Sequence, residues 1–443
     1  MQMTKKTVSK ELPPKKTVPP IGLVRGMRDL LPDDQPLWHL MRRKAQELVE
    51  AYGFERIDTP IIEETALFVR GVGKQTDIVE KELFSFDTVG GEHVSLRPEG
   101  TASVMRAYIH HGMFNQPQPV KLWYLGPMFR HDRPQHGRYR QHQQFGCEVL
   151  GDADAVIDAQ LILIAHLFYK ELGIDATVQV NSIGMPESRA NYKNALVSFF
   201  RSRRNRLSEE DKRRLAKNPL RVLDSKDPAV EEMKAEAPQI VDWLDEESKG
   251  HFMRVLEYLD ELNVPYQLNP YLVRGLDYYA KTVFEFYANS SDQTLAQASL
   301  GGGGRYDGLS DLLGGRPTPA VGFSVGLDRV LNCLKAAKIE VPERTTDIFV
   351  AQLGEQGRKK AFAVFEEFRK AGIAASETFG KGAIKAQMEI ANRKKVKYAI
   401  IIGQKEVIDG TAIIRDMDAG TQEIVDVRKV VQEVKKKLEK TKV

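Results

Sequence analysis

Hydrophobic and polar positions in the N-terminal part of the chain predict a helix followed by a strand. Apolar side chains recur at helical spacing before Gly53, which ends the helix, and Asp33 and Asp34 offer carboxylates to cap its start. The apolar positions are Leu37, Met41, Ala45, Leu48 and Tyr52. Residues 54–62 then form a predicted strand, and we expect it at an edge or an interface because Pro60 has no N–H to donate.

The middle of the chain alternates between apolar strands and helices. Residues 124–129 and 145–150 have the aromatic and β-branched residues and the Gly/Pro punctuation of buried strands. A helix is predicted over 152–172 and a strand over 176–183, whereas residues 191–262 are helical in pattern and rich in charge. The apolar positions expected in the core from the first of these helices are Val156, Ile157, Leu161, Ile164 and Phe168.

From residue 345 a different alternation begins, in which short strands are separated by amphipathic helices. Strands are predicted over 347–352, 373–377, 398–402 and 411–416, with helices over 357–371 and 384–394 and a last helix from Asp426. Alternation of this kind predicts a small α/β domain with a mixed sheet, whose parallel strands are crossed by helices. Residues 344–346 form the expected linker.

Composition narrows the class of protein. A chain of 443 residues exceeds the size at which one hydrophobic core usually stops growing, so two or three domains are expected. The net charge of +4 is too small to establish a nucleic-acid partner, although it allows local basic patches. Cys147 and Cys333 have no metal-ligand spacing, which favours a reducing compartment such as the cytosol over a disulfide framework or a zinc site.

Other signals of location or metal binding are weak. Residues 1–20 combine lysines with prolines but contain no apolar run of the signal-peptide kind, so we expect a disordered tail. The sequence has no run of about eighteen apolar residues that would cross a bilayer, so no membrane partner is expected. Five of the nine histidines lie between His110 and His142 without the i, i+4 repeat of a helical metal site, and no metal site is expected.

Candidate chemistry is concentrated in the loop between the two apolar segments, at residues 130–140. Arginines dominate this loop, and Asp132 is its only carboxylate; they are Arg130, Arg133, Arg138 and Arg140. An arginine at the end of an apolar strand needs an anion, and a phosphate is a suitable one where carboxylates are few. A solvated hairpin tip would carry the same residues, so the pattern alone leaves both interpretations open.

Three further stretches have both a structural and a functional interpretation. Glu99 and Thr101, before the apolar helix at 102–108, suit a helix N-terminus as well as a binding site. The glycines at 301–304 allow a backbone to approach a ligand closely, but such runs are also common in loops. Residues 320–329 form an apolar strand that runs through a glycine turn into an apolar helix, which also suits a purely structural role.

Together these stretches resemble class II aminoacyl-tRNA synthetases, in the version found in the bacterial type of the histidyl-tRNA synthetase family. The peptide FRHDRPQHGRYRQ at 129–141, with GCE at 146–148, is similar to motif 2. LVRGLDYY at 272–279 and GGGGRYDG at 301–308 resemble the two halves of a signature peculiar to this family, and GLDR at 326–329 resembles motif 3. The predicted helix before Gly53 and the strand at 54–62 resemble motif 1, which builds the dimer interface in such enzymes.

The resemblance implies an architecture and an activity. We expect an α+β catalytic domain with an antiparallel sheet at 21–343, a helical insertion within it at 191–262, and a C-terminal α/β anticodon-binding domain at 345–443. The implied reaction is ATP-dependent ligation of L-histidine to tRNA(His) through a histidyl-adenylate, in a cytoplasmic homodimer, with ATP as substrate and Mg²⁺ to neutralise the pyrophosphate. The alternative is a non-catalytic, histidyl-synthetase-like regulatory subunit of histidine biosynthesis, but those proteins generally lack the anticodon domain and parts of the signature.

The resemblance also implies the site residues. Arg130 and Arg274 are the implied catalytic residues, because the attack of a carboxylate on a phosphate needs fixed positive charge. Histidine binding is assigned to Glu99, Thr101, Gln144, Glu148, Tyr279 and Tyr306. ATP binding is assigned to Arg130, Arg138, His142, Arg274 and Arg329, and contact with the tRNA acceptor end to Arg133 and Gln135.

Two features leave alternatives open. His142 stands where family members usually have a phenylalanine that stacks on adenine; an imidazole can still stack, but it buries less apolar area and can titrate. The arginines grouped between residues 201 and 214 suit either the tRNA backbone or a solvated basic face.

Overall fold

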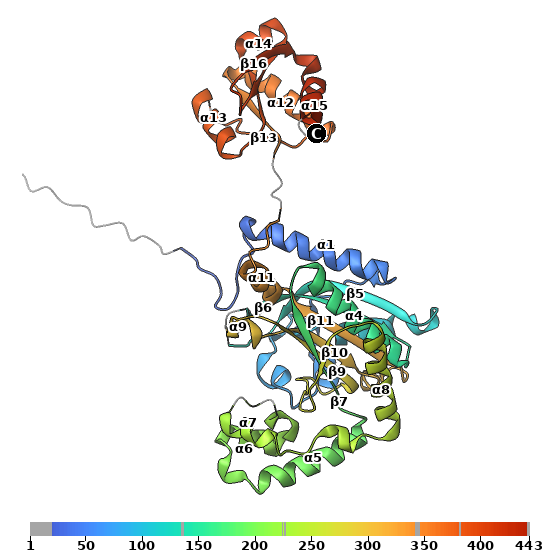
Figure 1. Cartoon of the computed structure of the whole chain (residues 1–443). Coiled ribbons are helices and arrows are strands. Elements are labelled where there is room, and N and C mark those ends of the chain that lie inside the picture. Colours follow the sequence, from blue (N-terminus) through green and yellow to red (C-terminus); the bar gives the residue numbers. More distant parts are fainter. Residues whose placement is uncertain are drawn as a thin grey trace, which may run out of the picture. The chain divides into compact units, whose positions relative to one another are not determined.

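The chain divides into two compact units, residues 1–341 and 342–443 (Figure 1). The computed structural model describes residues 20–133, 137–223, 225, 227–341, 346–380 and 382–440. Residues 1–19 of the expected tail and residues 344 and 345 of the expected linker lie outside this range. Within the described residues, no helix is long and apolar enough to cross a membrane.

The first unit is built on a mostly antiparallel sheet with the strand order β1-β5-β6-β11-β10-β9-β7-β8. The outermost pairs, β1–β5 and β7–β8, are parallel, and the inner pairs are antiparallel, which confirms the predicted sheet type. The strands are β1 (Glu55–Arg56), β5 (Val120–Phe129), β6 (Gln141–Leu150), β7 (Ala176–Ser182), β8 (Tyr266–Leu268), β9 (Ala280–Ala288), β10 (Ser299–Arg305) and β11 (Ala320–Gly326).

One face of this sheet is covered by long helices with which it shares a hydrophobic core. Trp38 and Met41 of α1, Phe168 of α4 and Phe145 and Phe323 of the sheet are buried together there. The helices are α1 (Gln35–Ala51), α4 (Ala155–Glu171), α8 (Glu246–Glu261) and α11 (Leu327–Ala336). The apolar spacing in α1 therefore marks a core face, as predicted.

Two expected details of these helices were wrong. Asp34 makes no capping hydrogen bond, because Pro32–Asp34 forms a 3₁₀ turn (η1) and the Asp34 carboxylate pairs with Lys335 at 2.5 Å. Val156 is 39% exposed and lies outside the core. Adjacent residues of a helix point about 100° apart, so Ile157 faces the core and its neighbour faces solvent.

The prediction of one strand over residues 54–62 was also wrong. β1 lies at the edge of the large sheet, whereas the later residues belong to a small sheet of order β2-β4-β3. Between them Pro60 has no N–H, and the guanidinium of Arg97 donates to the carbonyl of Thr59 at 2.7 Å, so neither group is available for a ladder. The strands of the small sheet are β2 (Ile62–Glu64), β3 (Ser85–Asp87) and β4 (His93–Leu96).

The glycines at 301–304 lie in β10, in the middle of the large sheet, and not in a loop. A Cβ atom on Gly303 would lie 2.0 Å from the carbonyl oxygen of Gly322, and one on Gly302 would lie 2.4 Å from that of Phe284. Glycine is therefore required because the backbones of β11 and β9 approach β10 closely on both sides.

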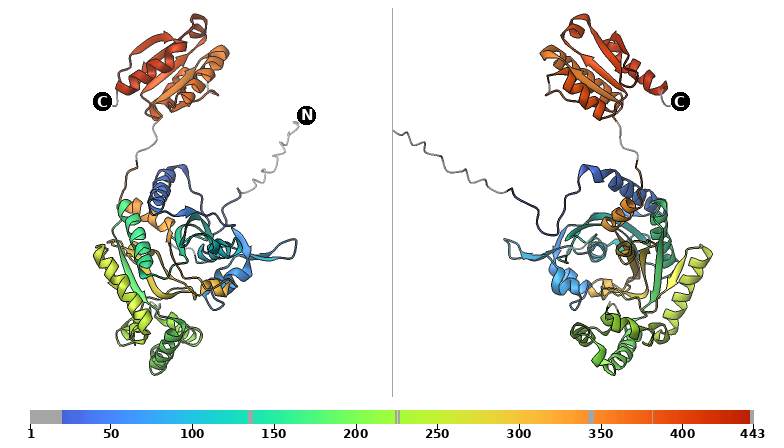
Figure 2. Two further views of the ribbon diagram at one scale, coloured as in Figure 1. Left: turned by 90° about the vertical axis from the view of Figure 1, so that its right-hand side faces the viewer. Right: turned by 60° about the vertical axis from the view of Figure 1, so that its left-hand side comes forward.

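Helices between β7 and β8 gather at one end of the first unit (Figures 1 and 2). The short elements and helices are α5 (Pro186–Arg201), η4 (Arg204–Arg206), α6 (Glu209–Lys217), η5 (Pro219–Val222), α7 (Pro228–Lys234) and η6 (Ile240–Trp243). The helix that follows them, α8, differs because Val255 and Leu259 belong to the core of the sheet. Several arginines of this region pair with carboxylates, as in Arg206–Glu232 at 2.7 Å.

Short elements complete the first unit. They are α2 (Thr65–Gly71), the π-helical turn η2 (Ile78–Glu82), α3 (Thr101–His110), η3 (Met113–Asn115), α9 (Gln293–Ala296) and α10 (Leu309–Leu312). Helix α3 confirms the helix predicted at 102–108.

The second unit has the mixed sheet that the alternating pattern predicted, in the order β13-β12-β14-β15-β16. β12 is parallel to β13 and β14, and the pairs β14–β15 and β15–β16 are antiparallel. The elements are β12 (Ile348–Gln352), α12 (Gly354–Lys370), β13 (Ala375–Glu377), α13 (Ile384–Arg393), β14 (Tyr398–Ile402), α14 (Gln404–Asp409), β15 (Thr411–Asp416), β16 (Gln422–Asp426), η7 (Val427–Lys429) and α15 (Val430–Lys440). The sequence analysis missed α14 and β16; β16 is an edge strand with no buried face, so its residues do not alternate.

Candidate active site

A cavity of about 520 Å³ lies on the face of the large sheet that the long helices leave open. Side chains alternate along β6, so His142 and Gln144 face the cavity while Phe145 and Cys147 face the helical core. The predicted site residues that line the cavity are Glu99, Thr101, Arg130, Arg138, His142, Gln144, Arg274, Tyr279 and Arg329. The structure thus brings together residues that lie up to 230 positions apart in the sequence.

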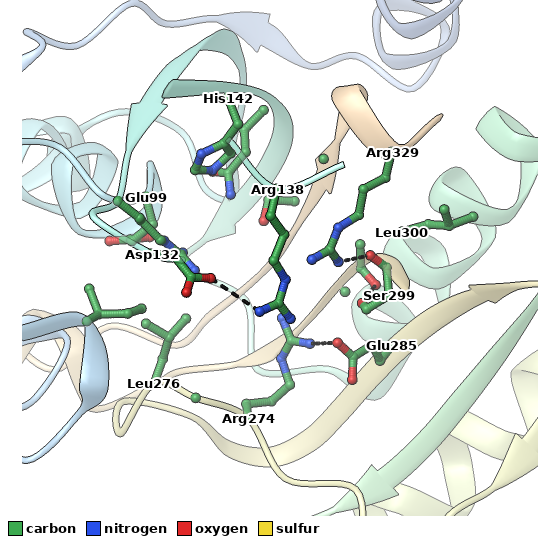
Figure 3. A pocket seen from close by; sticks show the side chains of 18 of the residues that line it. Glu99, Asp132, Arg138, His142, Arg274, Leu276, Glu285, Ser299, Leu300 and Arg329 are labelled. Atoms are coloured by element: carbon green, nitrogen blue, oxygen red, sulfur yellow. Dashed lines mark hydrogen bonds and ion pairs between the residues drawn. The ribbon is translucent and has the colours of Figure 1, made fainter. Parts of the chain in front are cut away.

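Arginines from separate elements converge in this cavity (Figure 3). Arg130 follows β5, and its Nε donates to the carbonyl of Pro98 at 2.9 Å. Arg274 pairs with Glu285 of β9 at 2.9 Å, Arg138 pairs with Asp132 at 3.2 Å, and Arg329 of α11 donates to the carbonyl of Ser299. Each side chain is thereby oriented, and Arg329 is held by a backbone carbonyl and not by a carboxylate within the described part of the chain.

Burial and neighbouring groups shift the pKa values of Arg329 and Arg274 in opposite directions. Burial, and then the neighbouring Arg138, lower the pKa of Arg329. Burial acts in the same direction on Arg274, but the Glu285 carboxylate together with Tyr279 and Tyr278 outweighs it and raises the pKa of Arg274 above its ordinary value. All these groups remain charged at neutral pH, so this end of the cavity attracts anions, and planar guanidinium groups suit the oxygens of a phosphate.

Glu99 is buried at the start of α3. Its two carboxylate oxygens accept hydrogen bonds from the backbone N–H groups of Thr101 at 2.7 Å and Ala102 at 2.9 Å. The helix-start role that the sequence suggested is therefore present, and the same carboxylate also lines the cavity. Burial raises the pKa of Glu99, although the two backbone hydrogen bonds oppose the shift.

Glu148 is fully buried and lies behind the cavity wall, together with Tyr306. One carboxylate oxygen accepts hydrogen bonds from the hydroxyls of Thr101 at 2.7 Å and Tyr124 at 3.4 Å, and the other accepts from the hydroxyl of Tyr306. Burial raises the pKa of Glu148 to about 8, and the hydrogen bonds from Tyr306 and Thr101 limit the rise. Glu148 and Tyr306, which were predicted to bind histidine, therefore do not line the cavity themselves. Glu148 contacts Thr101, which does line it, and Tyr306 donates to Glu148.

Glycines make room for this cluster. A Cβ atom on Gly322 of β11 would lie 1.6 Å from a carboxylate oxygen of Glu148, and Cβ atoms on Gly100 and Gly146 would lie 2.3 Å and 2.4 Å from the ring of Tyr124. Larger residues at these positions would displace the carboxylate or the phenol. Gly146 and Gly322 therefore leave the space that the buried side chains of Tyr124 and Glu148 occupy.

Comparisons with known proteins agree with this geometry. The family model described as "Histidyl-tRNA synthetase" matches residues 26–330, and that of the "Anticodon binding domain" matches residues 347–437. Proteins named histidine–tRNA ligase from Dehalococcoides mccartyi and Pelotomaculum thermopropionicum are each 43% identical over 416 residues, which cover 94% of this chain and 99% and 97% of theirs. The chain belongs to the histidyl-tRNA synthetase family.

Solved structures of the family share the fold. The apo histidyl-tRNA synthetase of S. aureus is 35% identical and superposes with a TM-score of 0.77, over 93% of this chain and 99% of that one. A protein from Bacillus halodurans C, titled as an ATP phosphoribosyltransferase regulatory subunit/histidyl-tRNA synthetase, is 21% identical with a TM-score of 0.61, over 87% of this chain and 99% of that one. At that level of identity the second likeness concerns the fold alone.

His142, which the resemblance led us to expect as a phenylalanine, does not titrate near neutral pH. It lies on β6 opposite Met128 of β5 and lines the cavity near Arg130 and Arg329. Burial, and then the charges of these two arginines, lower the pKa of His142 to about 3. The imidazole is therefore neutral above about pH 4, and it offers an uncharged flat ring as a phenylalanine would.

The two residues assigned to the tRNA acceptor end are placed differently from the rest. Arg133 is exposed beyond the end of β5 and does not line the cavity. Gln135 lies outside the described residues. Their assignment stays a prediction.

Several cavity residues were missed by the sequence analysis. Glu285 and Tyr278 line the cavity, as do Glu82 of η2 and Arg221 of η5. The sequence could have indicated Glu285, because it is the one carboxylate in the apolar strand AKTVFEFYA. Glu82 and Arg221 stand among other charged residues, so the sequence does not distinguish them. Asp328, beside Arg329, is also more than a helix-start acid, since it accepts from Arg28 at 2.6 Å.

Proposed function

We propose that this chain is a histidine–tRNA ligase, which activates L-histidine with ATP to histidyl-adenylate and transfers the acyl group to tRNA(His). Close relatives across nearly the whole chain, and the presence of both family domains, favour ligation over the regulatory alternative. The feature of the structure that supports it most is the cavity, in which arginines of the motif-2-like, signature and motif-3-like segments meet next to two buried carboxylates.

The arginine end of the cavity would bind ATP. Arg130 and Arg274 would stabilise the negative charge that shifts on the α-phosphate when the histidine carboxylate attacks it. Arg138 and Arg329 would hold the leaving pyrophosphate, and His142 would stack on adenine. The chain supplies fixed charge and orientation here, and a general base is not required because the nucleophile is already an anion.

The carboxylate end of the cavity would bind histidine. Glu99, which keeps its backbone hydrogen bonds, and Thr101 would receive the α-amino group. Tyr279 and Gln144 line the same space, and Glu148 with Tyr306 lies directly behind it. Buried groups that match both imidazole nitrogens, one a donor and one an acceptor in the neutral ring, reject other amino acids strongly, because any unmatched polar group is left unpaired.

Mg²⁺ fits this site as an ion that arrives with ATP. Carboxylates that line the cavity, among them Glu82, Asp132 and Glu285, are oxygen ligands of the kind that Mg²⁺ prefers. Within the described residues no group of three or more side chains forms a metal site, which suits an ion held mainly by phosphate oxygens with one or two carboxylates. Bound there, Mg²⁺ would neutralise charge on the pyrophosphate.

The proposal extends to tRNA recognition and assembly. The second unit would bind the anticodon of tRNA(His), in keeping with the family match at 347–437. Arg133 and Gln135 would contact the acceptor end, since guanidinium and amide groups read base edges and phosphates. We further propose a cytoplasmic homodimer formed through the motif-1-like segment.

ATP–pyrophosphate exchange with each amino acid tests the proposal. We expect exchange with L-histidine and none with the others, followed by charging of tRNA(His). Exchange with a different amino acid would overturn the assignment of the substrate. No exchange with any amino acid would favour a regulatory role.

A further inference from the structure

The cavity segment that carries Arg274 is held by side chains from the helices between β7 and β8. Arg189 of α5 donates from Nη1 to the carbonyl of Tyr279 at 2.6 Å. Arg221 of η5 donates from Nη2 to the carbonyl of Gly275 at 3.3 Å. These two contacts bracket residues 275–279, the signature segment immediately after Arg274.

Arg221 also contacts a second segment that lines the cavity, at Asp77. Its Nη1 pairs with Asp77 at 3.0 Å, and Asp77 directly precedes η2, whose Ile78 and Glu82 line the cavity. Close by, Lys217 of α6 pairs with Glu80 of η2 at 3.0 Å. One guanidinium therefore joins the inserted helices, the signature segment and η2, and it lines the cavity itself.

The inserted helices share a core with the histidine end of the site. Their buried side chains pack in one cluster with Val273, Tyr278, Tyr279 and Tyr306. The members contributed by the inserted helices include Tyr192, Leu196, Phe200, Val222 and Leu223. The insertion is thus continuous with the active-site wall, and a movement of η5 would be transmitted to Gly275.

We propose that Arg221 is a positioning residue for histidine activation, which sets the location of Arg274 by holding the Gly275 carbonyl and Asp77 together. This inference rests on the proposed function. An arginine suits the role because its planar fork can donate to two acceptors in different directions at once. A displacement of about 1 Å in a group that aligns reactants can cost about 100-fold in rate.

The test compares Arg221→Ala with Arg213→Ala in the full-length chain. Arg213 lies on the exposed side of the neighbouring α6, and its guanidinium donates to the carbonyl of Glu209 in the same helix. In ATP–pyrophosphate exchange, we expect R221A to lower kcat about 10- to 100-fold with little change in KM for histidine. R213A is expected to match the wild type, and Arg221→Lys, which keeps the charge but not the fork, to recover part of the loss.

A double-mutant cycle separates positioning from general destabilisation. Asp77→Asn keeps the size of the side chain but weakens its pair with Arg221, so we expect D77N to lower kcat and R221A/D77N to lose little beyond R221A. Multiplicative losses would overturn the proposed bridge. If R221A fails to fold, D77N and R221K carry the same comparison, and wild-type kcat in both would overturn the inference.

The outcome is distinguishable from failure of the proposed function. A wild-type chain that exchanges with histidine, together with an R221A variant that exchanges equally well, overturns this inference alone. A wild-type chain that exchanges with no amino acid overturns both.

Discussion

The two ends of the cavity bury groups of opposite charge, guanidinium groups at one end and a carboxyl group at the other. At the arginine end, Arg138 and Arg274 pair with carboxylates, whereas Arg130 and Arg329 are held by backbone carbonyls. Burial lowers the pKa of Arg329 without removing its charge. At the carboxylate end, burial raises the pKa of Glu148 to about 8, and hydroxyl groups surround the carboxylate. The arginine end thus keeps positive charge, whereas at the carboxylate end both oxygens of Glu148 have hydroxyl partners.

This difference matches the two substrates proposed. A polyphosphate brings its own negative charge, which suits an end where Arg130 and Arg329 are held by backbone carbonyls. An imidazole is a weak, directional partner, so the carboxylate end needs acceptors that are already oriented. Substitutions that affect one end should therefore leave the parameters of the other end nearly unchanged.

The largest effect is expected for Arg274→Ala at the arginine end. Loss of this charge should lower ATP–pyrophosphate exchange about 100- to 1000-fold, because the charge acts mainly in the transition state. Histidine binding, measured by calorimetry, should be retained, since the carboxylate end is intact. Exchange near the wild-type rate would remove Arg274 from the mechanism.

Removal of the second unit should leave both ends of the cavity intact. A chain ending at Arg344 is expected to activate histidine normally but to charge tRNA(His) about 100-fold more slowly, because placement of the tRNA depends on the missing unit. Exchange and charging are measured on the same preparation. Equal losses in both assays would show that the second unit supports the first structurally.

Glu148→Gln should affect the carboxylate end alone. We expect kcat/KM for histidine to fall about 10- to 100-fold in the exchange assay while KM for ATP stays constant. The reason is that the NH₂ group of an amide cannot accept a hydrogen bond, so not all the hydroxyl groups that now donate to Glu148 would keep an acceptor. Tyr124→Phe is the matched control, since it removes only the longest of these contacts, at 3.4 Å. A rise in KM for ATP as large as that for histidine would contradict the separation of the two ends.

The smallest effect concerns the pH dependence of stability. Because burial raises the pKa of Glu148 from 4.5 to about 8, the folded chain binds more protons at this group than the unfolded chain does between these values. The contribution of Glu148 to stability must therefore fall as pH rises through this range. Glu148→Gln should flatten the decline of Tm between about pH 5 and pH 8. Parallel Tm curves for the two proteins would show that Glu148 does not titrate there.

Local sequence patterns predicted much of the fold, but they failed where residues far apart in the sequence interact with the same backbone groups. The apolar segments around residues 124–129 and 145–150 became the central strands β5 and β6, and the alternation after residue 345 became a mixed sheet. The strand over 54–62 failed because Arg97, from another part of the chain, takes the carbonyl of Thr59. The glycine run at 301–304 could be placed in a strand only once its neighbours β9 and β11 were known.

Arg305 illustrates the same limit within the signature GGGGRYDG. Its guanidinium is fully buried and donates from Nε to Asp158 of α4 at 3.1 Å, which fixes the end of β10 beside Tyr306. A buried ion pair of this kind depends on both partners being enclosed together. Asp158 lies 147 residues earlier, and its place in an ordinary apolar helix gave no sign of this role.

The sequence by itself determined which chemical groups are present and in which local elements they lie: the arginines of the 130–140 loop, the carboxylates Glu99 and Glu148, and the signature around Arg274. Periodicity and motif spacing are local properties, so they can be read along the chain. The tertiary structure alone decided that Glu148 lies behind the cavity and not in its wall, that His142 stays neutral, and that Arg221 joins Gly275 to Asp77. These properties depend on burial and on contacts between residues far apart in sequence, which arise only when the strands and helices pack together.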